Sequence, residues 1–430
     1  VASPLFSALP LARYGLEWVH PPLCLAHPLD AGPAAWLDRS VTAVVRDLGT
    51  DGPAYRALIG GLADAWDDSV EGLLGPPLSL PGAGLARWST GLRSADAVAR
   101  SFSGARGRAL FAGLAAHSMI PLERRASAGV GLALAAAGHA AGWPFPRGGT
   151  GSLTAALVAL LEDLGGEVIT GRRVRSLLDV PPAPATVLDL TPRPIARLLA
   201  DSVPPAYRRA LSRFRYGPGA YKLDWALSEP IPWTSEACRR AGTVHVGGTF
   251  EEIARAERAA WTGQGGDRPF VLVAQPSRFD STRTPDEGHT GWAYCHVPHG
   301  SSEDWTDRIE AQVERFAPGF RECIRARSVT TPADFEKRNA NLIGGDIGGG
   351  ALTLGRIMTG PVLRRDPYTT PLPHVFVCSA STPPGAGVHG MCGFHAARSV
   401  LRRRFGIHVP TSPARALGPR LREFDSRRIV

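Results

Sequence analysis

The feature that most constrains the fold is an apolar strand followed at once by a glycine-rich turn and a helix near the C-terminus. The apolar run His374 to Ser379 predicts the strand, Ser381 to Gly387 the turn, and Val388 to Arg404 the helix. The segment Gly385-Ala386-Gly387-Val388-His389-Gly390 matches G-x-G-x-x-G in most of the context that a dinucleotide fingerprint requires. This unit predicts an α/β protein.

The fingerprint is nevertheless incomplete as a dinucleotide site. Such a site needs a second parallel strand that ends in an acidic residue about 20 positions further on, to hold the ribose. Here the helix runs into three arginines and then Pro410, with no acid in place. The turn can instead present backbone N–H groups and the positive end of the helix to an electron-rich ring edge, such as the N1 and O2 edge of a reduced flavin. The alternative is a glycine turn that only lets a helix pack on a sheet.

Composition narrows the class of protein. A chain of 430 residues with 44% hydrophobic and 20% charged residues is globular and long enough for two or three domains. Its net charge is +9, but residues 402–430 carry +6 of it, so nucleic-acid binding is not expected. Six cysteines without a CxxC pair favour a reduced cytoplasmic protein, and they exclude a redox-active dithiol of that kind. No apolar stretch is long enough to span a bilayer.

Upstream of the C-terminal unit the pattern changes twice. Residues 1 to about 145 predict loops and helices, with helices at 53–74 and 94–114 and an Ala-rich segment near Gly129. A glycine turn at Gly148-Gly149 then precedes a helix from Ser152 to Gly165, and short strands are predicted at 167–170, 173–178 and 185–190. From 207 to 331, one strong helix at 304–316 accompanies strands at 220–227, 243–246, 270–274 and 290–296.

The C-terminal unit resembles the flavin signature of phytoene desaturases and their relatives, a group that includes the pyridine nucleotide-disulfide oxidoreductase domain-containing proteins. The family often has His where Pro383 stands. Two further segments, residues 146–174 and 341–350, also resemble the family. The resemblance implies cofactor-binding roles for Gly148, Gly149, Val174, Asp346, Thr382, Pro384, Gly385, Gly387, Val388 and Gly390.

The resemblance also implies the architecture. We expect an α/β fold in which discontinuous segments form an FAD/NAD(P)-binding Rossmann-like domain, joined to an α+β substrate domain with a mixed or antiparallel sheet. The expected divisions are a remnant of the FAD domain (1–20), a helical part of the substrate domain (21–144), an FAD-domain segment (145–200), the substrate-domain sheet (201–334), a C-terminal FAD-domain segment (335–409) and a flexible basic tail (410–430).

For function, the resemblance implies FAD as cofactor and an oxidoreductase that removes hydride from an apolar substrate, such as a polyene, to flavin N5. The electron acceptor stays open among oxygen, a quinone and a nicotinamide, and peripheral contact with a membrane is compatible with such a substrate. Two alternatives remain: a non-redox carotenoid-type isomerase and a non-catalytic binding protein with the same fold. A yellow purified protein would exclude the second.

The family's N-terminal strand-GxGxxG-helix unit, which binds the FAD diphosphate, has no counterpart upstream of Gly385. We therefore expect this chain to be N-terminally truncated, with such a turn encoded shortly before Val1. We also expect residues 1–430 alone to bind FAD weakly.

Three polar side chains in the segments that resemble the family are candidates for a role at the site. Asp346, between two glycine pairs, could cap a helix, bind a ribityl hydroxyl or sit in a simple turn. His389 and His395 are the candidate proton donors, although a lone histidine is more often a packing residue.

Three further histidines and five tryptophans are expected to have structural roles. No metal site is expected from His289, His296 and His299, because alternate strand residues face opposite ways and no carboxylate or Cys pattern completes a site. Five tryptophans could line an apolar pocket, but most are expected in the core: Trp225, Trp233, Trp261, Trp292 and Trp305.

Overall fold

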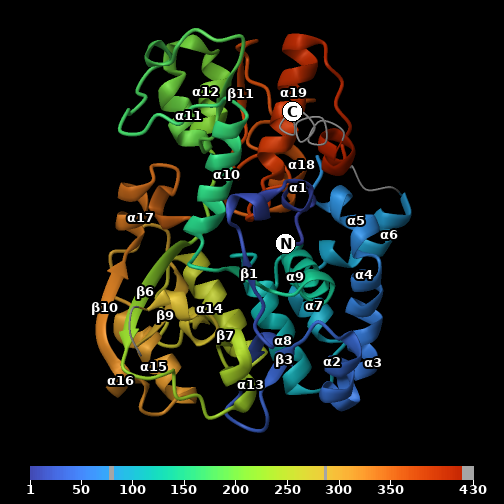
Figure 1. The fold of residues 1–430 in the computed structure, drawn as a ribbon. Helices are drawn as coiled ribbons and strands as arrows, with labels where there is room; N and C mark the ends of the chain where they lie inside the picture. The colour runs from blue at the N-terminus through green and yellow to red at the C-terminus, as the bar shows by residue number, and fades with distance from the viewer. Residues whose placement is uncertain (77–81, 285–287, 419–430) are drawn as a thin grey trace.

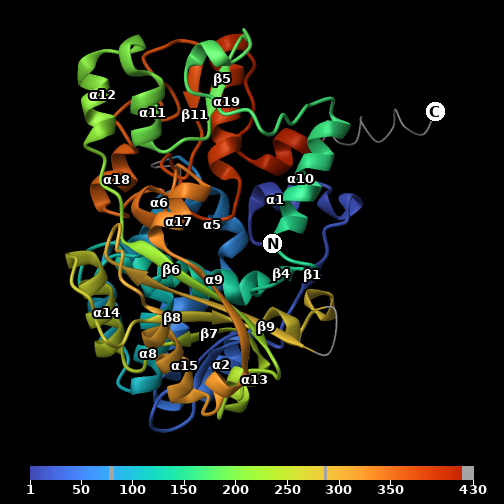
Figure 2. The ribbon, with the colours of Figure 1, turned by 90° about the vertical axis from the view of Figure 1, so that its left-hand side faces the viewer.

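The computed structural model describes residues 1–76, 82–284 and 288–418. Figure 1 shows a lower body built around a large sheet and an upper body that contains the C-terminal helix. The chain passes between the two bodies several times, so each is assembled from segments far apart in sequence, as Figure 2 shows from the side. This is the discontinuous arrangement that the sequence analysis predicted.

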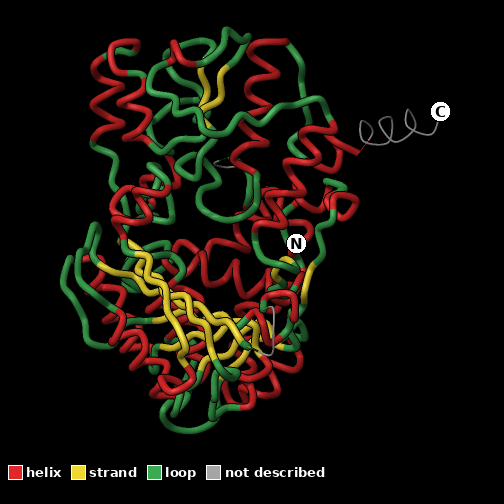
Figure 3. Tube along the Cα trace, turned by 60° about the vertical axis from the view of Figure 1, so that its left-hand side comes forward, coloured by secondary structure: helices red, strands yellow, loops and turns green. Residues whose placement is uncertain are grey.

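The lower body centres on a mixed sheet, which Figure 3 shows in yellow. Within the described residues, its strands in spatial order are β10 (Ile324–Thr330), β6 (Gly219–Leu227), β9 (His289–Val297), β8 (Val271–Ala274), β7 (Ala241–Val246), β2 (Leu23–His27) and β3 (Ala35–Leu37). All neighbours pair antiparallel except β2 and β7, which are parallel. The predicted mixed sheet is confirmed.

The register gives the sheet one apolar and one partly polar face, since successive residues point to opposite sides. One row across the strands is apolar: Leu223, Ala293, Val273 and Val244. These residues are buried and pack with α15 (Thr306–Phe316), α16 (Phe320–Cys323) and neighbouring residues. The next row on the opposite face is more polar: Lys222, Tyr294, Leu272 and His245. On this face α14 (Phe250–Thr262) lies against β9.

Helices complete the lower body. Alanine- and glycine-rich α8 (Ala105–Ala116) and α9 (Ser127–Ala141) pack closely, with Gly131 so near Ala115 that a side chain there would meet the Ala115 backbone at 3.0–3.1 Å. Around them lie α2 (Val41–Leu48), α3 (Gly52–Tyr55), a π-helical turn (Arg56–Gly60), α4 (Gly61–Asp64), α5 (Trp66–Leu73), α6 (Gly82–Trp88) and α7 (Ala95–Ala99). The short helix α13 (Glu236–Arg240) precedes β7.

The upper body holds a parallel pair of strands, β5 (Thr186–Leu188) and β11 (Val375–Val377). Its helices are α1 (Pro4–Ala8), α10 (Gly151–Asp163), α11 (Pro192–Leu198), α12 (Pro205–Ser212), α18 (Leu354–Thr359) and α19 (Met391–Phe405), whereas α17 (Pro332–Arg338) lies against β6 and β10 of the large sheet. The strands β1 (Trp18–Val19) and β4 (Phe145–Pro146) pair where the chain passes between the bodies.

Two sequence predictions about the upper body are wrong in part. The predicted strands at 167–170 and 173–178 are both absent, and Val168, Ile169 and Val174 are 44%, 60% and 44% exposed. A strand needs a partner for its ladder, and β5 pairs only with β11 among the described residues. The helix at the signature begins at Met391 and not at Val388, because Gly390 adopts a left-handed φ of 68° immediately before it.

Two other expected divisions also need correction. The expected helical part, 21–144, supplies β2 and β3 to the sheet. In the expected flexible tail, Ser412 donates a hydrogen bond of 2.6 Å to the Glu71 carboxylate, so the tail's first residues contact α5. Residues 419–430 of that tail lie outside the described residues.

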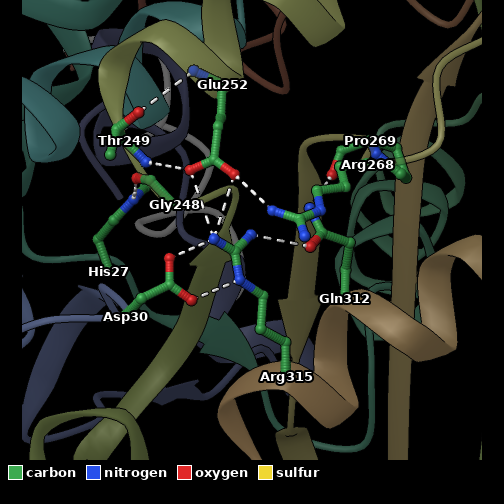
Figure 4. A network of polar contacts seen from close by, with 9 residues as sticks. All are labelled: His27, Asp30, Gly248, Thr249, Glu252, Arg268, Pro269, Gln312 and Arg315. Atoms are coloured by element: carbon green, nitrogen blue, oxygen red, sulfur yellow. Dashed lines mark hydrogen bonds and ion pairs between the residues drawn. The ribbon is translucent and has the colours of Figure 1, made fainter.

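A polar network ties α15 to the start of α14 and to the loop after β2 (Figure 4). Arg315 donates to Asp30 through Nε at 2.6 Å and to Glu252 through Nη2 at 3.1 Å. Glu252 also accepts from the Thr249 N–H in a capping box at 2.9 Å. Burial alone would raise the pKa of Glu252, but the Thr249 N–H and Arg315 outweigh it and hold the pKa below its usual value.

We expect Arg315→Met to lower the free energy of unfolding by about 1–2 kcal/mol, because two carboxylates lose their shared partner. Urea denaturation measures this change. Arg321→Met is the matched control, since Arg321 lies 3.9 Å from an Asp307 side chain that is 95% exposed, and it should change stability by less than about 0.5 kcal/mol. Equal effects of the two substitutions would contradict the network's role.

Candidate functional site

The signature turn is open to solvent. Val388 is 82% exposed, and a side chain built at Gly385 would meet no atom within 4 Å. Gly385 and Gly387 have φ values of 112° and 141°, which favour glycine. Within the described residues, the N–H groups of Ala386, Gly387 and Val388 have no acceptor in the chain. The turn therefore presents free backbone donors beside the N-terminus of α19.

Thr382 is buried at the base of this turn, and Pro384 is partly buried. Thr382 is 1% exposed, and its hydroxyl donates to the Ser379 carbonyl at 2.7 Å. Its role here is to hold the turn. Gly390 is in close contact with α1, because a side chain there would meet Leu5 at 2.8 Å and Phe6 at 3.1 Å.

The buried side chain of His389 forms hydrogen bonds on both sides of the turn. Its Nδ1 accepts the Met391 N–H at 3.0 Å, and therefore Nε2 carries the proton and donates to the Gly385 carbonyl at 3.2 Å. Burial lowers the pKa of His389, so the ring is neutral near pH 7. With both nitrogens occupied, His389 serves as a structural strut of the turn.

His395 is also satisfied within the chain. Its Nε2 donates to the Leu74 carbonyl at 2.9 Å, and its Nδ1 lies 3.4 Å from Arg398 Nη1. Burial lowers its pKa to about 4. Neither sequence candidate for a proton donor has a free ring nitrogen in this conformation.

The glycine-rich loop 343–350 lies against the base of the turn. The Ser381 hydroxyl donates to the Gly349 carbonyl at 2.6 Å, while Arg356 donates to the Gly349 carbonyl at 3.2 Å and to the Ala380 carbonyl at 2.9 Å. Ser381 and Arg356 were not singled out from the sequence, and a lone arginine soon after three consecutive glycines was the available signal. Together they fix the loop to the signature.

Asp346 is buried inside that loop. Its carboxylate accepts from the Gly217 N–H and the Gly348 N–H, both at 2.7 Å, and the residue is 1% exposed. Burial raises its pKa, although these two amides oppose the shift. Of the three roles weighed from the sequence, the geometry matches a carboxylate that holds a turn together and joins it to the chain entering β6.

The same loop brings the sheet to the signature. At Gly219, the first residue of β6, a side chain would meet the Gly344 carbonyl at 2.7 Å, and at Gly348 it would lie 3.8 Å from Met119, just beyond α8. The start of β6, paired with the end of β9, therefore meets the loop at Gly344, and the segment after α8 meets it at Gly348, next to the residue that bonds Ser381. This junction is the candidate functional site.

The remaining sequence candidates lie elsewhere. The Gly148 N–H donates to Asp280 at 2.8 Å, and a side chain at Gly149 would meet Arg283 at 3.1 Å. Val174 lies in an exposed segment without strand structure. Within the described residues, these three make no hydrogen bond to residues 382–390.

Two cavities flank Asp366, which lies near the C-terminal half of α19 and not at the turn. The larger, of about 400 Å³, is lined in part by Arg364, Arg403 and Arg404. The described residues contain no group of three or more His, Cys, Asp or Glu side chains placed to hold a metal ion. Among those residues, no helix is both long and apolar enough to cross a membrane.

The fold is shared with solved oxidoreductases. An oxidoreductase from Methanosarcina mazei superposes with a TM-score of 0.60 at 15% identity, covering 93% of this chain and 85% of its own. A putrescine oxidase double mutant superposes with a TM-score of 0.55 at 14% identity, covering 98% of this chain and 85% of its own. The chain has the fold of the FAD-dependent oxidoreductases.

Sequence relatives narrow this class. The chain is 24% identical over 308 residues to pyridine nucleotide-disulfide oxidoreductase domain-containing protein 2 of Mus musculus, covering 60% of this chain and 51% of the relative. It is 28% identical over 275 residues to the lycopene-forming phytoene desaturase of Pantoea ananas, covering 58% and 54%. It thus spans about half the length of these relatives, and no protein-family model matches it. The resemblance to this group of FAD-dependent oxidoreductases is confirmed.

Proposed function

We propose that the protein is an FAD-dependent oxidoreductase that holds the isoalloxazine ring at the signature turn and takes hydride from an apolar substrate. The observation that carries this proposal is the open turn at 385–388, whose unpaired amides stand beside the N-terminus of α19. Relatives named phytoene desaturase support an apolar substrate. The electron acceptor is one of oxygen, a quinone or a nicotinamide.

The residues present fit a flavin edge. Three consecutive amides without acceptors would cost stability in a dry environment, but the turn is exposed and can donate them to a ligand. The positive end of α19 adds to their preference for negative charge. FAD, when bound, supplies an acceptor for hydride, and the amides stabilise the charge that gathers on its pyrimidine edge.

His389, Ser381 and Arg356 contribute by fixing the turn. Because His389 bridges the Gly385 carbonyl and the Met391 N–H, the free amides keep one orientation before a ligand arrives. Such preorganisation favours binding, since less conformational freedom is lost on association. These side chains thus position the donors and need not exchange protons.

Titration of the protein with FAD and with lumiflavin, which has the ring but no diphosphate, tests the proposal. Both should bind the 430-residue chain, with affinities within about ten-fold of each other, because the described site offers donors to the ring and residues upstream of Gly385 contain no second GxGxxG turn. Flavin fluorescence quenching measures both affinities. If lumiflavin fails to bind, the turn does not hold the ring and the proposal is wrong.

A further inference from the structure

A histidine–carboxylate pair lies on the polar face of the sheet, outside the signature. His296 is on β9 and Glu257 is on α14, and they are 5% and 1% exposed. His296 Nδ1 lies 2.8 Å and 2.9 Å from the two carboxylate oxygens. A carboxylate accepts only, so Nδ1 carries a proton and donates it to Glu257.

The other ring nitrogen of His296 is left without a partner. Nε2 is buried and makes no hydrogen bond in the described structure. In the tautomer that carries its single proton on Nδ1, Nε2 presents a lone pair directed away from Glu257. Buried polar atoms are normally paired, so this nitrogen requires a donor from a water or a ligand.

The position of the pair points to the junction. His296 is opposite Ala220 in the sheet, and Val297 is opposite Gly219, the residue that abuts the Gly344 carbonyl of the glycine-rich loop. His296 is therefore one residue from the strand end that meets the candidate site. The free nitrogen therefore lies at the end of the sheet that meets the glycine-rich loop.

Aromatic rings continue along the same face of β9. The Tyr294 and His296 ring centroids are 5.7 Å apart, and Trp292 stacks on Tyr294 at 6.3 Å with an interplanar angle of 16°. Both Trp292 and Tyr294 retain some exposure to solvent, whereas His296 is buried. The row thus offers apolar ring surface that leads to one polar atom.

The local charge favours a donor over an anion. Glu257 supplies a carboxylate that His296 Nδ1 contacts at 2.8 Å, and burial lowers the pKa of His117 to about 3, so His117 is neutral near pH 7. An anionic group here would lie close to the Glu257 carboxylate, whose oxygens contact His296 Nδ1. A hydroxyl or an amine would satisfy Nε2 without that repulsion.

We infer that His296, held by Glu257, is a substrate-binding residue that accepts a hydrogen bond from a hydroxyl or amino group on an otherwise apolar substrate, whose body lies along Trp292 and Tyr294. This inference rests on the proposed function for the location of the reacting carbon, and it deepens that function by naming a polar end group. It accounts for the unpaired nitrogen and the aromatic row together.

Binding of matched eight-carbon probes tests the inference. The probes are 1-octanol, octylamine, the methyl ether of octanol and octanoate, and binding is measured by the quenching of tryptophan fluorescence. We expect octanol or octylamine to bind at least about ten-fold more tightly than the ether, which has no donor. Equal binding of the alcohol, the amine and the ether, or tightest binding of octanoate, would overturn the inference.

Substitutions of His296 and Glu257 test whether this pair causes the preference for hydrogen-bond donors over the ether. The double variant His296→Phe with Glu257→Leu removes both polar groups without stranding a charge, and it should bind the donors and the ether equally. His296→Gln keeps an acceptor oxygen and should retain part of the preference, whereas His289→Gln, at the other end of β9 on its opposite face, should retain all of it. Full preference in the double variant would refute the role of His296. If the double variant does not fold, the single variants still test the role of His296. A complete loss of the donor preference in His289→Gln, or an unchanged preference in His296→Gln, would refute that role.

Flavin absorbance separates this inference from the proposed function. If the wild-type protein binds flavin but shows no donor preference, the inference is wrong and the proposed function stands. If it shows the preference but binds neither FAD nor lumiflavin, the proposed function is wrong and the polar binding site stands.

Discussion

Val388→Asp is expected to weaken flavin binding by about ten-fold, or ~1.4 kcal/mol. The substitution places a carboxylate beside the free amides of Gly387 and Val388, where the proposed ligand presents its electron-rich edge. Two unit charges of like sign about 5 Å apart near a protein surface repel by about 3 kcal/mol, and the value here is smaller because the edge of an oxidised flavin carries only partial negative charge and solvent surrounds the exposed turn. Fluorescence titration with lumiflavin measures the loss directly.

Two controls make this result specific. The asparagine of Val388→Asn has nearly the size of aspartate but no charge, so this variant should bind lumiflavin within about three-fold of the wild type. Leu92→Asp adds the same charge at an exposed position on another part of the molecule, where the wild-type leucine is 53% exposed. If all three variants bind lumiflavin equally, the ring edge does not face this turn.

Asp366→Ala is expected to lower the free energy of unfolding by about 3 kcal/mol. The carboxylate accepts from the Ser399 hydroxyl at 2.7 Å, Arg402 at 2.8 Å and Arg403 at 2.9 Å, and only 7% of its side chain is exposed. Its removal leaves two arginines of α19 side by side without their shared partner. When such an ion pair is buried, the removal of one partner costs several kcal/mol of stability. Both arginines are about half exposed, which keeps the expected value at the lower end.

The same contacts make this contribution depend on pH. Burial would raise the pKa of Asp366, but the Ser399 hydroxyl and Arg403 outweigh it and hold the pKa below its usual value. A depressed folded-state pKa means that the carboxylate stabilises the protein above its unfolded pKa of about 4, and that this stability is lost as pH falls through the lower folded pKa. Urea denaturation at pH 7 and at pH 3 should show the wild type losing its advantage over Asp366→Asn at the lower pH.

Asp201→Ala is the matched control for this prediction. The Asp201 side chain is fully exposed and lies 3.4 Å from Arg208, so its removal should leave stability within about 0.5 kcal/mol of the wild type at both pH values. A constant difference between wild type and Asp366→Asn across pH would show that the carboxylate's charge does not stabilise α19.

The sequence predicted those elements whose pattern is local. The strands β6, β7, β8 and β9 and the helix α15 lie within two or three residues of their predicted bounds, because alternation and helical spacing are properties of short windows. The strand β2 was missed because all five of its residues are buried, which removes the alternation. The edge strand β10 was missed because it carries exposed charges such as Arg325 and Arg327.

The helix α14 was also missed, although a signal was present. Its core-facing residues include Glu257, which interrupts the apolar spacing, yet the Thr249 and Glu252 capping box marks its start. The sequence thus identified the signature turn but not the partners that define its chemistry. The ring nitrogens of His389 and His395, the bonds of Arg356 and the pairing of His296 all depend on residues distant in the chain or on turn geometry that no sequence pattern specifies.

A contact between two segments that are far apart in sequence has a consequence for synthesis. The Ser3 hydroxyl donates to the His389 carbonyl at 2.6 Å, a separation of 386 residues. At ribosomal rates of about 5–20 residues per second, roughly 20 to 80 seconds pass before that partner exists. During this time Leu5 and Phe6 lack the surface around Gly390 against which they later pack. These two apolar side chains therefore stay uncovered during this interval, which makes the segment around them a suitable target for chaperones that act on the ribosome.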